Sequence, residues 1–140
     1  MIALSRLFAA PVPVHAHCDI PCGIYDPHAA TIAAQTVAKM VEKINDLGKA
    51  PMDLSFGNSM TRFVHVKEEH AEIVKHELQV LWSDYFKPEH LAKYPNLHDT
   101  FWKALKLASK NKQTVDAAAA ADLQKAVKEI SDMFWETKKA

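Results

Sequence analysis

Residues 26–48 read DPHAATIAAQTVAKMVEKINDLG, and this segment sets the helical character of the chain. Asp26 is typical of a helix N-cap, and Pro27 is typical of the first helical position that follows. Gly48 predicts the helix end, since glycine readily adopts the backbone conformation that closes a helix. Apolar side chains between these ends recur every three to four residues, as in an amphipathic helix. They are Ile32, Val37, Met40, Val41 and Ile44.

A second helix follows after a connection over residues 48–58. Ser59 or Thr61 is predicted to begin it, because both hydroxyl side chains suit an N-cap. It is expected to run to about Tyr85, before Pro88 stops it and starts a short turn. Its predicted apolar stripe consists of Phe63, Val66, His70, Val74, Leu78 and Leu81.

Two more helices occupy the C-terminal third of the chain. Pro95 is expected to open the third helix, and residues 111–116 are predicted to form a loop. The alanine run 117–121 strongly favours a fourth helix. The stripes are Leu97, Phe101, Leu105 and Ala108 in the third helix, and Leu123, Val127, Ile130 and Phe134 in the fourth.

These four amphipathic helices, with connections of modest length, predict an all-α fold, an antiparallel four-helix bundle with an irregular N-terminal segment. The 140 residues suit one domain. The 17 basic and 17 acidic side chains cancel, so no global field attracts nucleic acid or a membrane surface. No apolar run reaches the length of a membrane-spanning helix. We therefore expect neither a nucleic-acid nor a membrane partner.

Both cysteines lie just before the first helix, in HCDIPCGIYDP, residues 17–27. Two cysteines so close together can form a disulfide, bind a metal or carry out thiol chemistry. Their spacing is not that of a zinc knuckle, and no second cysteine pair completes a four-ligand zinc site. The paired Glu-x-x-His motifs of a di-iron bundle are also absent.

Residues 1–16 have two readings. The segment is a poor secretory signal, because Pro11 and Pro13 interrupt a short apolar region. Composition alone favours an N-terminal arm. The alternative is a leader cut between Ala16 and His17, where the small residue Ala16 resembles a cleavage site.

Cleavage before His17 would create a distinctive set of metal donors. The new α-amine, the Cys18 amide nitrogen and the Cys18 sulfur would form two fused five-membered chelate rings. Cys22 returns through the turn at Pro21 and can supply a fourth donor. A plane of two nitrogens and two sulfurs suits nickel(II) or copper(II). The His17 imidazole can then serve as an axial ligand.

Residues 17–25, HCDIPCGIY, resemble the nickel hook of the nickel-dependent superoxide dismutases. Three further segments resemble the same family, so the similarity runs from His17 to the end of the chain. They are LWSDYFKP at 81–88, KYP at 93–95 and FWETKKA at 134–140.

The resemblance implies a superoxide dismutase that converts superoxide to dioxygen and hydrogen peroxide by Ni(III)/Ni(II) cycling, with one nickel ion per chain. It implies that His17, Cys18 and Cys22 bind the metal. Tyr25 would order water or small anions beside the open face of the metal. Asp19 and Pro21 would shape the hook.

The resemblance also implies an organisation: residues 1–16 are a leader removed by a dedicated protease, and residues 17–140 form the bundle, with the hook at 17–25. A homohexamer and a cytoplasmic location follow from the same family.

One departure from the family concerns the axial imidazole. Some members steady it with a glutamate in the first helix and an arginine in the second, and these positions correspond to Ala33 and His70 here. His70 is therefore a candidate for a different supporting partner. The other histidines are interpreted as structural or solvated: His90 and His98 near prolines, and His65, Glu69, Glu72 and His76 on a polar face of the second helix.

Two other functions share these residues. A nickel- or copper-binding protein without catalysis would use the same ligands. A thiol-redox or structural bundle would pair Cys18 with Cys22 in a disulfide and need no metal.

Overall fold

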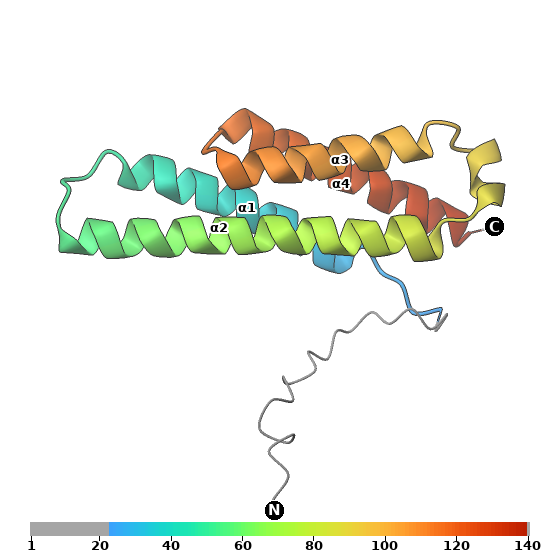
Figure 1. Ribbon diagram of the computed structural model, residues 1–140, viewed down its shortest axis with the longest axis horizontal. Coiled ribbons are helices and arrows are strands. Elements are labelled where there is room, and N and C mark those ends of the chain that lie inside the picture. Colours follow the sequence, from blue (N-terminus) through green and yellow to red (C-terminus); the bar gives the residue numbers. More distant parts are fainter. Residues whose placement is uncertain (1–22, 140) are drawn as a thin grey trace, which may run out of the picture.

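The computed structural model describes residues 23–139, which form an antiparallel bundle of four long helices (Figure 1). The predicted residues His17, Cys18, Asp19, Pro21 and Cys22, and the predicted leader, lie outside the described residues. Each helix packs on the next in the chain, and α4 packs back on α1. The predicted all-α bundle is confirmed. The four helices are α1 (His28–Leu47), α2 (Leu54–Val80), α3 (Leu97–Gln113) and α4 (Ala117–Thr137).

Two short elements join α2 to α3 at the end of the bundle where the chain also terminates (Figure 1). The first, η2 (Leu81–Tyr85), is a π-helical turn that continues α2 directly. The second, η3 (Pro88–Ala92), is a 3₁₀ helix with its proline at the first position. The predicted extent of the second helix to Tyr85 and the short turn after Pro88 are confirmed.

The α1 helix begins at His28 with Pro27 as its N-cap, one residue later than the predicted cap at Asp26. The Asp26 carboxylate accepts a hydrogen bond of 2.7 Å from the His28 backbone N–H. The Pro27 carbonyl accepts the first intrahelical bond from Thr31, at 3.0 Å. Alanines supply much of the buried face of α1, whereas Ile32, which we predicted on the apolar stripe, is 46% exposed. That part of the predicted stripe was wrong.

The start of α2 was also predicted wrongly. The helix begins at Leu54, capped by Asp53, whose carboxylate accepts a bond of 2.7 Å from the Phe56 N–H. Gly57 and Asn58 lie inside the helix, although both are weak helix formers. The α1–α2 hairpin therefore projects beyond the α3–α4 corner (Figure 1).

The buried face of α2 is turned from the prediction at its N-terminal half. Lys67 and Ala71 are buried, whereas Phe63, Val66 and His70 are only half-buried. Towards the C-terminus the predicted stripe holds. The core combines residues from all four helices, and the whole predicted stripe of α4 is buried in it: Leu123, Val127, Ile130 and Phe134.

A buried lysine caps the C-terminus of α3. The Lys67 ammonium donates hydrogen bonds to the backbone carbonyls of Asn111, Lys112 and Thr114, at 2.5, 2.9 and 3.0 Å. Asn111 and Lys112 lie in the last turn of α3 and Thr114 directly follows it, so their carbonyls have no partner within the helix. Because an ammonium has three donor hydrogens, the three carbonyls saturate it.

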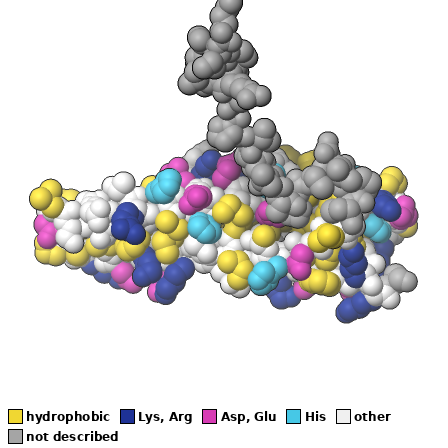
Figure 2. All heavy atoms as spheres, turned by 90° about the horizontal axis from the view of Figure 1, so that it is seen from below, with side chains coloured by type: hydrophobic (Ala, Val, Ile, Leu, Met, Phe, Trp, Pro, Cys, Tyr) yellow, Lys and Arg dark blue, Asp and Glu magenta, His cyan; other side chains and the backbone are white. Residues whose placement is uncertain are grey.

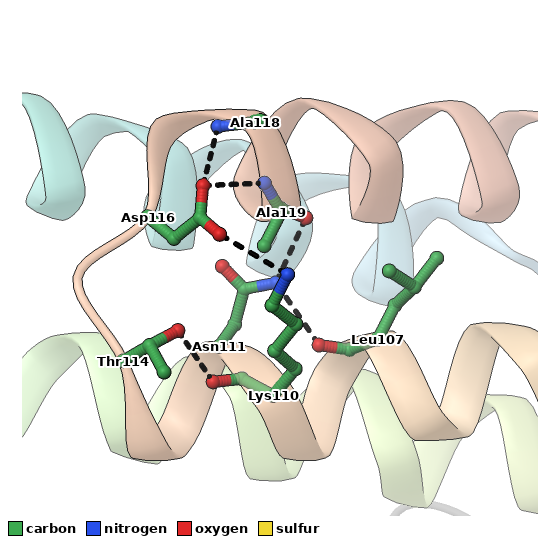
Figure 3. Close-up of polar contacts among 7 residues, drawn as sticks. All are labelled: Leu107, Lys110, Asn111, Thr114, Asp116, Ala118 and Ala119. Atoms are coloured by element: carbon green, nitrogen blue, oxygen red, sulfur yellow. Dashed lines mark hydrogen bonds and ion pairs between the residues drawn. The ribbon is translucent and has the colours of Figure 1, made fainter.

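Asn111, predicted in a loop, lies in the last turn of α3 and is fully buried. Its amide nitrogen donates to the carbonyls of Leu107 and Ala119, which ties α3 to the start of α4 (Figure 3). Asp116 caps α4 through the N–H groups of Ala118 and Ala119 (Figure 3). The loop between the helices is therefore only residues 114–116.

Charges of both signs and histidines are interspersed along the face shown in Figure 2, with hydrophobic side chains at the tip of the α1–α2 hairpin. Among the large hydrophobic residues of the described range 23–139, the two most exposed are Met52 and Leu54, and both belong to this tip. None of the helices in residues 23–139 is both long and apolar enough to cross a membrane.

Candidate functional site

Tyr25 is the first predicted site residue that the structure describes. Gly23 precedes it with a φ of +72°, a left-handed conformation that glycine adopts without steric cost. The chain then turns through Tyr25 into the cap of α1. This geometry places the end of the predicted hook at the N-terminal end of α1.

Tyr25 packs on Tyr85, with ring centroids 5.5 Å apart and planes tilted by 56°. The π-helical turn η2 supplies Tyr85. The Phe86 N–H donates to the Leu81 carbonyl at 3.0 Å, one residue further back than in an α-helix. The wider turn changes the directions of the side chains that follow, and π-turns of this kind are frequent at functional sites.

The last turn of α4 holds Tyr85 from the other side. The Tyr85 hydroxyl lies 2.6 Å from Thr137 Oγ1, which also lies 2.6 Å from the Phe134 carbonyl. The Phe134 ring centroid is 4.4 Å from that of Tyr85. The Lys138 ammonium lies 5.0 Å from the centre of the Tyr85 ring, within cation–π range. Tyr85 is therefore fixed from two sides, by the segment that precedes α1 and by the C-terminal end of α4.

These aromatic rings border an open pocket of about 440 Å³. Gly23, the first residue that the structure describes, is part of its lining. Two lysines and two acidic side chains line it, so its charged groups balance. Its lining consists of Gly23, Tyr25, Asp84, Tyr85, Lys87, Glu89, His90, Thr137 and Lys138.

His90 was interpreted from the sequence as a surface or packing residue, and the structure places it in this pocket wall. Its ring is stacked with Tyr85, at 6.0 Å between centroids and 24° between planes. Its Nδ1 accepts a hydrogen bond of 3.1 Å from the Lys87 backbone N–H. No pattern in the sequence indicated this position, because the contact with Tyr85 depends on the η2 and η3 turns.

His70 is half-buried in α2, as predicted. Its Nδ1 lies 2.9 Å from the Val66 carbonyl. A carbonyl can only accept, so Nδ1 carries the proton and Nε2 of the neutral ring is an acceptor. Ala33, at the other position expected to support an axial imidazole, is 2% exposed in the core of the bundle.

The polar face of α2 is solvated, as predicted. His65, Glu69, Glu72 and His76 are all exposed, and Glu72 forms an ion pair of 2.7 Å with Lys112 from α3. The Lys112 ammonium, followed by the charge of Lys75, lowers the pKa of Glu72 against a smaller opposing effect of desolvation. Within residues 23–139, no three His, Cys, Asp or Glu side chains are grouped so that they could hold a metal ion.

Comparison with known proteins identifies the family. The sequence profile described as nickel-containing superoxide dismutase matches residues 12–138. The chain belongs to the nickel-containing superoxide dismutases. A superoxide dismutase [Ni] from Streptomyces seoulensis is 47% identical over 137 residues, which are 98% of this chain and 99% of the relative. One from Streptomyces coelicolor is 47% identical over 139 residues, with the same coverage.

Solved nickel superoxide dismutases share the fold. A native structure solved at 1.30 Å matches with a TM-score of 0.78 and 44% identity, over 89% of this chain and 100% of its own. A structure with nickel ligation corresponding to the oxidized state gives a TM-score of 0.77 at 44% identity. The chain is thus a nickel superoxide dismutase that disproportionates superoxide to dioxygen and hydrogen peroxide, with nickel as its cofactor.

Proposed function

We propose that this dismutase binds nickel through a hook formed by His17, Cys18 and Cys22, made available when the chain is cut before His17. One observation carries this proposal. The enzyme needs nickel, yet residues 23–139 contain no group of side chains suited to a metal. The remaining segment holds both cysteines of the chain. Both facts support a nickel site among the residues that precede Gly23.

The donor set fits nickel. The Cys18 and Cys22 thiolates, the Cys18 amide nitrogen, and the α-amine and imidazole of His17 would hold the metal, and this set of nitrogen and sulfur donors suits nickel(II). Bound nickel supplies the one-electron chemistry, because it cycles between the +2 and +3 states. Asp19 and Pro21 would shape the turn that brings Cys22 back towards Cys18.

The pocket beside Gly23 supports this location. Gly23 lines the pocket together with Tyr25 and Tyr85. Because Cys22 is bonded to Gly23, we expect a hook that folds back at this point to meet these rings. Tyr25 would then order water or a small anion beside the metal. The contacts of Tyr85 with Thr137 and Phe134 would keep this aromatic wall in place while superoxide enters and peroxide leaves.

Cleavage by a dedicated protease would release residues 1–16 and turn the His17 nitrogen into an amine. The comparisons support a leader of this size. The curated relatives align with 98% of this chain, whereas the whole of the native solved chain aligns with 89% of it. In the uncut protein the His17 nitrogen would be an amide, and the predicted chelate would lack one donor.

His70 is our candidate for supporting the axial imidazole. Because its Nδ1–H is bonded to the Val66 carbonyl, its Nε2 is an acceptor for an imidazole N–H. Such outer partners orient metal ligands and fix their tautomers. Ala33 cannot take this part, since it has no polar side chain.

Assembly as a homohexamer, in the cytoplasm, completes the proposal. Several large hydrophobic side chains are exposed on the outer faces of the described helices, as is common where subunits meet. Light scattering on the processed enzyme would test the assembly. These exposed residues include Ile32, Ile73, Trp102 and Trp135.

The central experiment compares processed wild type, Cys18→Ser and the uncut form. Each is measured for intact mass, nickel per chain and superoxide dismutation. We expect a processed wild type that begins at His17, holds about one nickel and is active. Cys18→Ser and the uncut form should hold no nickel and be inactive. His65→Ala is the matched control, because His65 is exposed and outside the pocket.

Each alternative makes a different prediction. Nickel bound without turnover would indicate a metal-binding protein that is not catalytic. A Cys18–Cys22 disulfide with no metal dependence would indicate a thiol-redox or structural bundle. Activity retained in Cys18→Ser would contradict the hook itself.

A further inference from the structure

His90 is held rigidly in the wall of the pocket beside Tyr25. Its ring is stacked with Tyr85 and meets the edge of Phe86, with centroids 5.6 Å apart and planes at 84°. The 3₁₀ helix η3 carries its backbone, and the His90 N–H donates to the Lys87 carbonyl at 3.0 Å. The ring therefore has one well-defined position.

The hydrogen bond from Lys87 also fixes the tautomer of His90. A backbone N–H can only donate, so Nδ1 must accept with its lone pair, at 3.1 Å. The neutral imidazole then carries its single proton on Nε2. His90 is consequently a directed N–H donor rather than a ring whose two nitrogens can exchange roles.

This donor has no protein partner among residues 23–139: the only hydrogen bond of the His90 side chain in that range is the one at Nδ1. The ring is half-buried and lines the pocket. A polar group at a half-buried position needs water or a ligand to satisfy it. The pocket thus offers a neutral N–H donor beside Tyr25.

We propose that His90 Nε2–H donates a hydrogen bond to superoxide in this pocket and is a substrate-positioning residue of the dismutase. This inference rests on the proposed function, since it requires the nickel hook to lie at the same pocket. The ligand class is a small oxyanion. A hydrogen bond to a charged acceptor is stronger and more directional than one between neutral groups, so a single fixed donor can orient a diatomic anion.

Three substitutions separate the possible roles of His90. His90→Gln retains an N–H donor near the Nε2 position. His90→Asn retains an acceptor for the Lys87 N–H, but its shorter side chain does not bring its amide N–H to the Nε2 position. His90→Phe retains only the ring stacked with Tyr85. All are measured as nickel-loaded, processed enzyme, with the rate constant of dismutation from pulse radiolysis and the affinity for azide as a superoxide-sized anion.

If His90 is the donor, azide affinity and the rate constant should fall about tenfold or more in His90→Asn and His90→Phe, the factor typical of a hydrogen bond to a charged group. His90→Gln should lose less than about threefold. If His90→Asn behaves like the wild type, the role of His90 is to accept the Lys87 N–H in η3, and the proposal is wrong. If His90→Phe behaves like the wild type, the role of His90 is to stack on Tyr85, and the proposal is again wrong. An equal loss in all three variants would likewise overturn the proposal.

A second measurement does not depend on how the variants fold. In the wild-type nickel(II) enzyme, ¹⁵N spectra of the histidine rings should show His90 protonated on Nε2. Azide should shift this nitrogen and leave those of exposed His65 unchanged. An unshifted His90 would refute the proposal. If processed wild type binds no nickel, the proposed hook has failed instead, so the two failures are distinguishable.

Discussion

Replacing Lys67 with methionine tests whether the buried ammonium stabilises the bundle. Methionine has nearly the same length and fills the same space, so little cavity energy is added. The change leaves the carbonyls of Asn111, Lys112 and Thr114 without their donor. The bond to Asn111 is fully buried, and losing a charged hydrogen bond there costs about 1.5–3 kcal/mol.

The other two carbonyls are only partly buried, so water can replace some of what they lose. We assign about 1 kcal/mol to both together. The expected loss for Lys67→Met is therefore about 2.5–4 kcal/mol in the free energy of unfolding. For a domain of this size that corresponds to a fall in Tm of roughly 10–16 °C.

Urea unfolding followed by far-ultraviolet circular dichroism, at fixed protein concentration, gives the unfolding midpoint and its slope. Lys112→Met is the matched control. Lys112 lies at the same corner, but its ion pair with Glu72 is substantially exposed, and such pairs contribute less than about 1 kcal/mol.

An opposite outcome is physically reasonable and would refute the argument. Burial lowers the pKa of Lys67, with Glu68 opposing it, so desolvation does act against this charge. If desolvation outweighs the three carbonyl bonds, Lys67→Met will be as stable as the wild type or more stable, as for some buried ion pairs replaced by apolar groups.

Three further predictions concern the scaffold. The Ala119 N–H and then Lys110 lower the pKa of Asp116 below its usual 3.8, so its stabilising effect is present above pH 3.8 and is lost as pH falls through the lower folded-state pKa. Acid titration of stability should therefore be shallower in Asp116→Asn, and an unchanged slope would contradict this. Phe101→Ala should cost about 3–5 kcal/mol in urea unfolding, because Phe101 is fully buried, whereas Trp102→Ala, 54% exposed, should cost about 1 kcal/mol or less. Nickel removal should abolish dismutation but leave the helical circular dichroism unchanged, and a large loss of helix would show that the metal supports the bundle.

The apolar pattern predicted the helices well and their ends less well. In α4 the predicted stripe is the buried face, because an alanine-rich start and a regular apolar spacing agree there. The start of α2 was missed since Gly57 and Asn58 have low helix propensity, while the Asp53 cap and tertiary packing outweigh it. Asn111 was assigned to a loop because asparagine also has low helix propensity. Its hydrogen bond to the Ala119 carbonyl explains why this polar side chain is buried in the bundle.

Lys67 illustrates a limit of pattern reading. A charged residue is expected on the solvated side of a helix, so the predicted stripe of α2 was drawn through Val66 and His70 instead. Only the fold brings the end of α3 within reach of Lys67, across more than forty residues of sequence. The site shows the same limit: the sequence indicated Tyr25, but its contact with Tyr85 joins segments sixty residues apart.

Residues 23–139 form the folded bundle, whereas both cysteines lie in the segment that precedes it. Buried side chains and backbone caps hold residues 23–139 together with no metal ligand group among them, so the described bundle needs no nickel to explain its packing. The bundle instead presents a fixed aromatic wall, Tyr25 and Tyr85, with the directed N–H donor of His90, at the point where the chain leaves for the cysteine segment. Under the proposed function, cleavage before His17 would then supply the last donor of a hook joined to a scaffold whose packing does not depend on the metal, so processing rather than folding would control nickel binding.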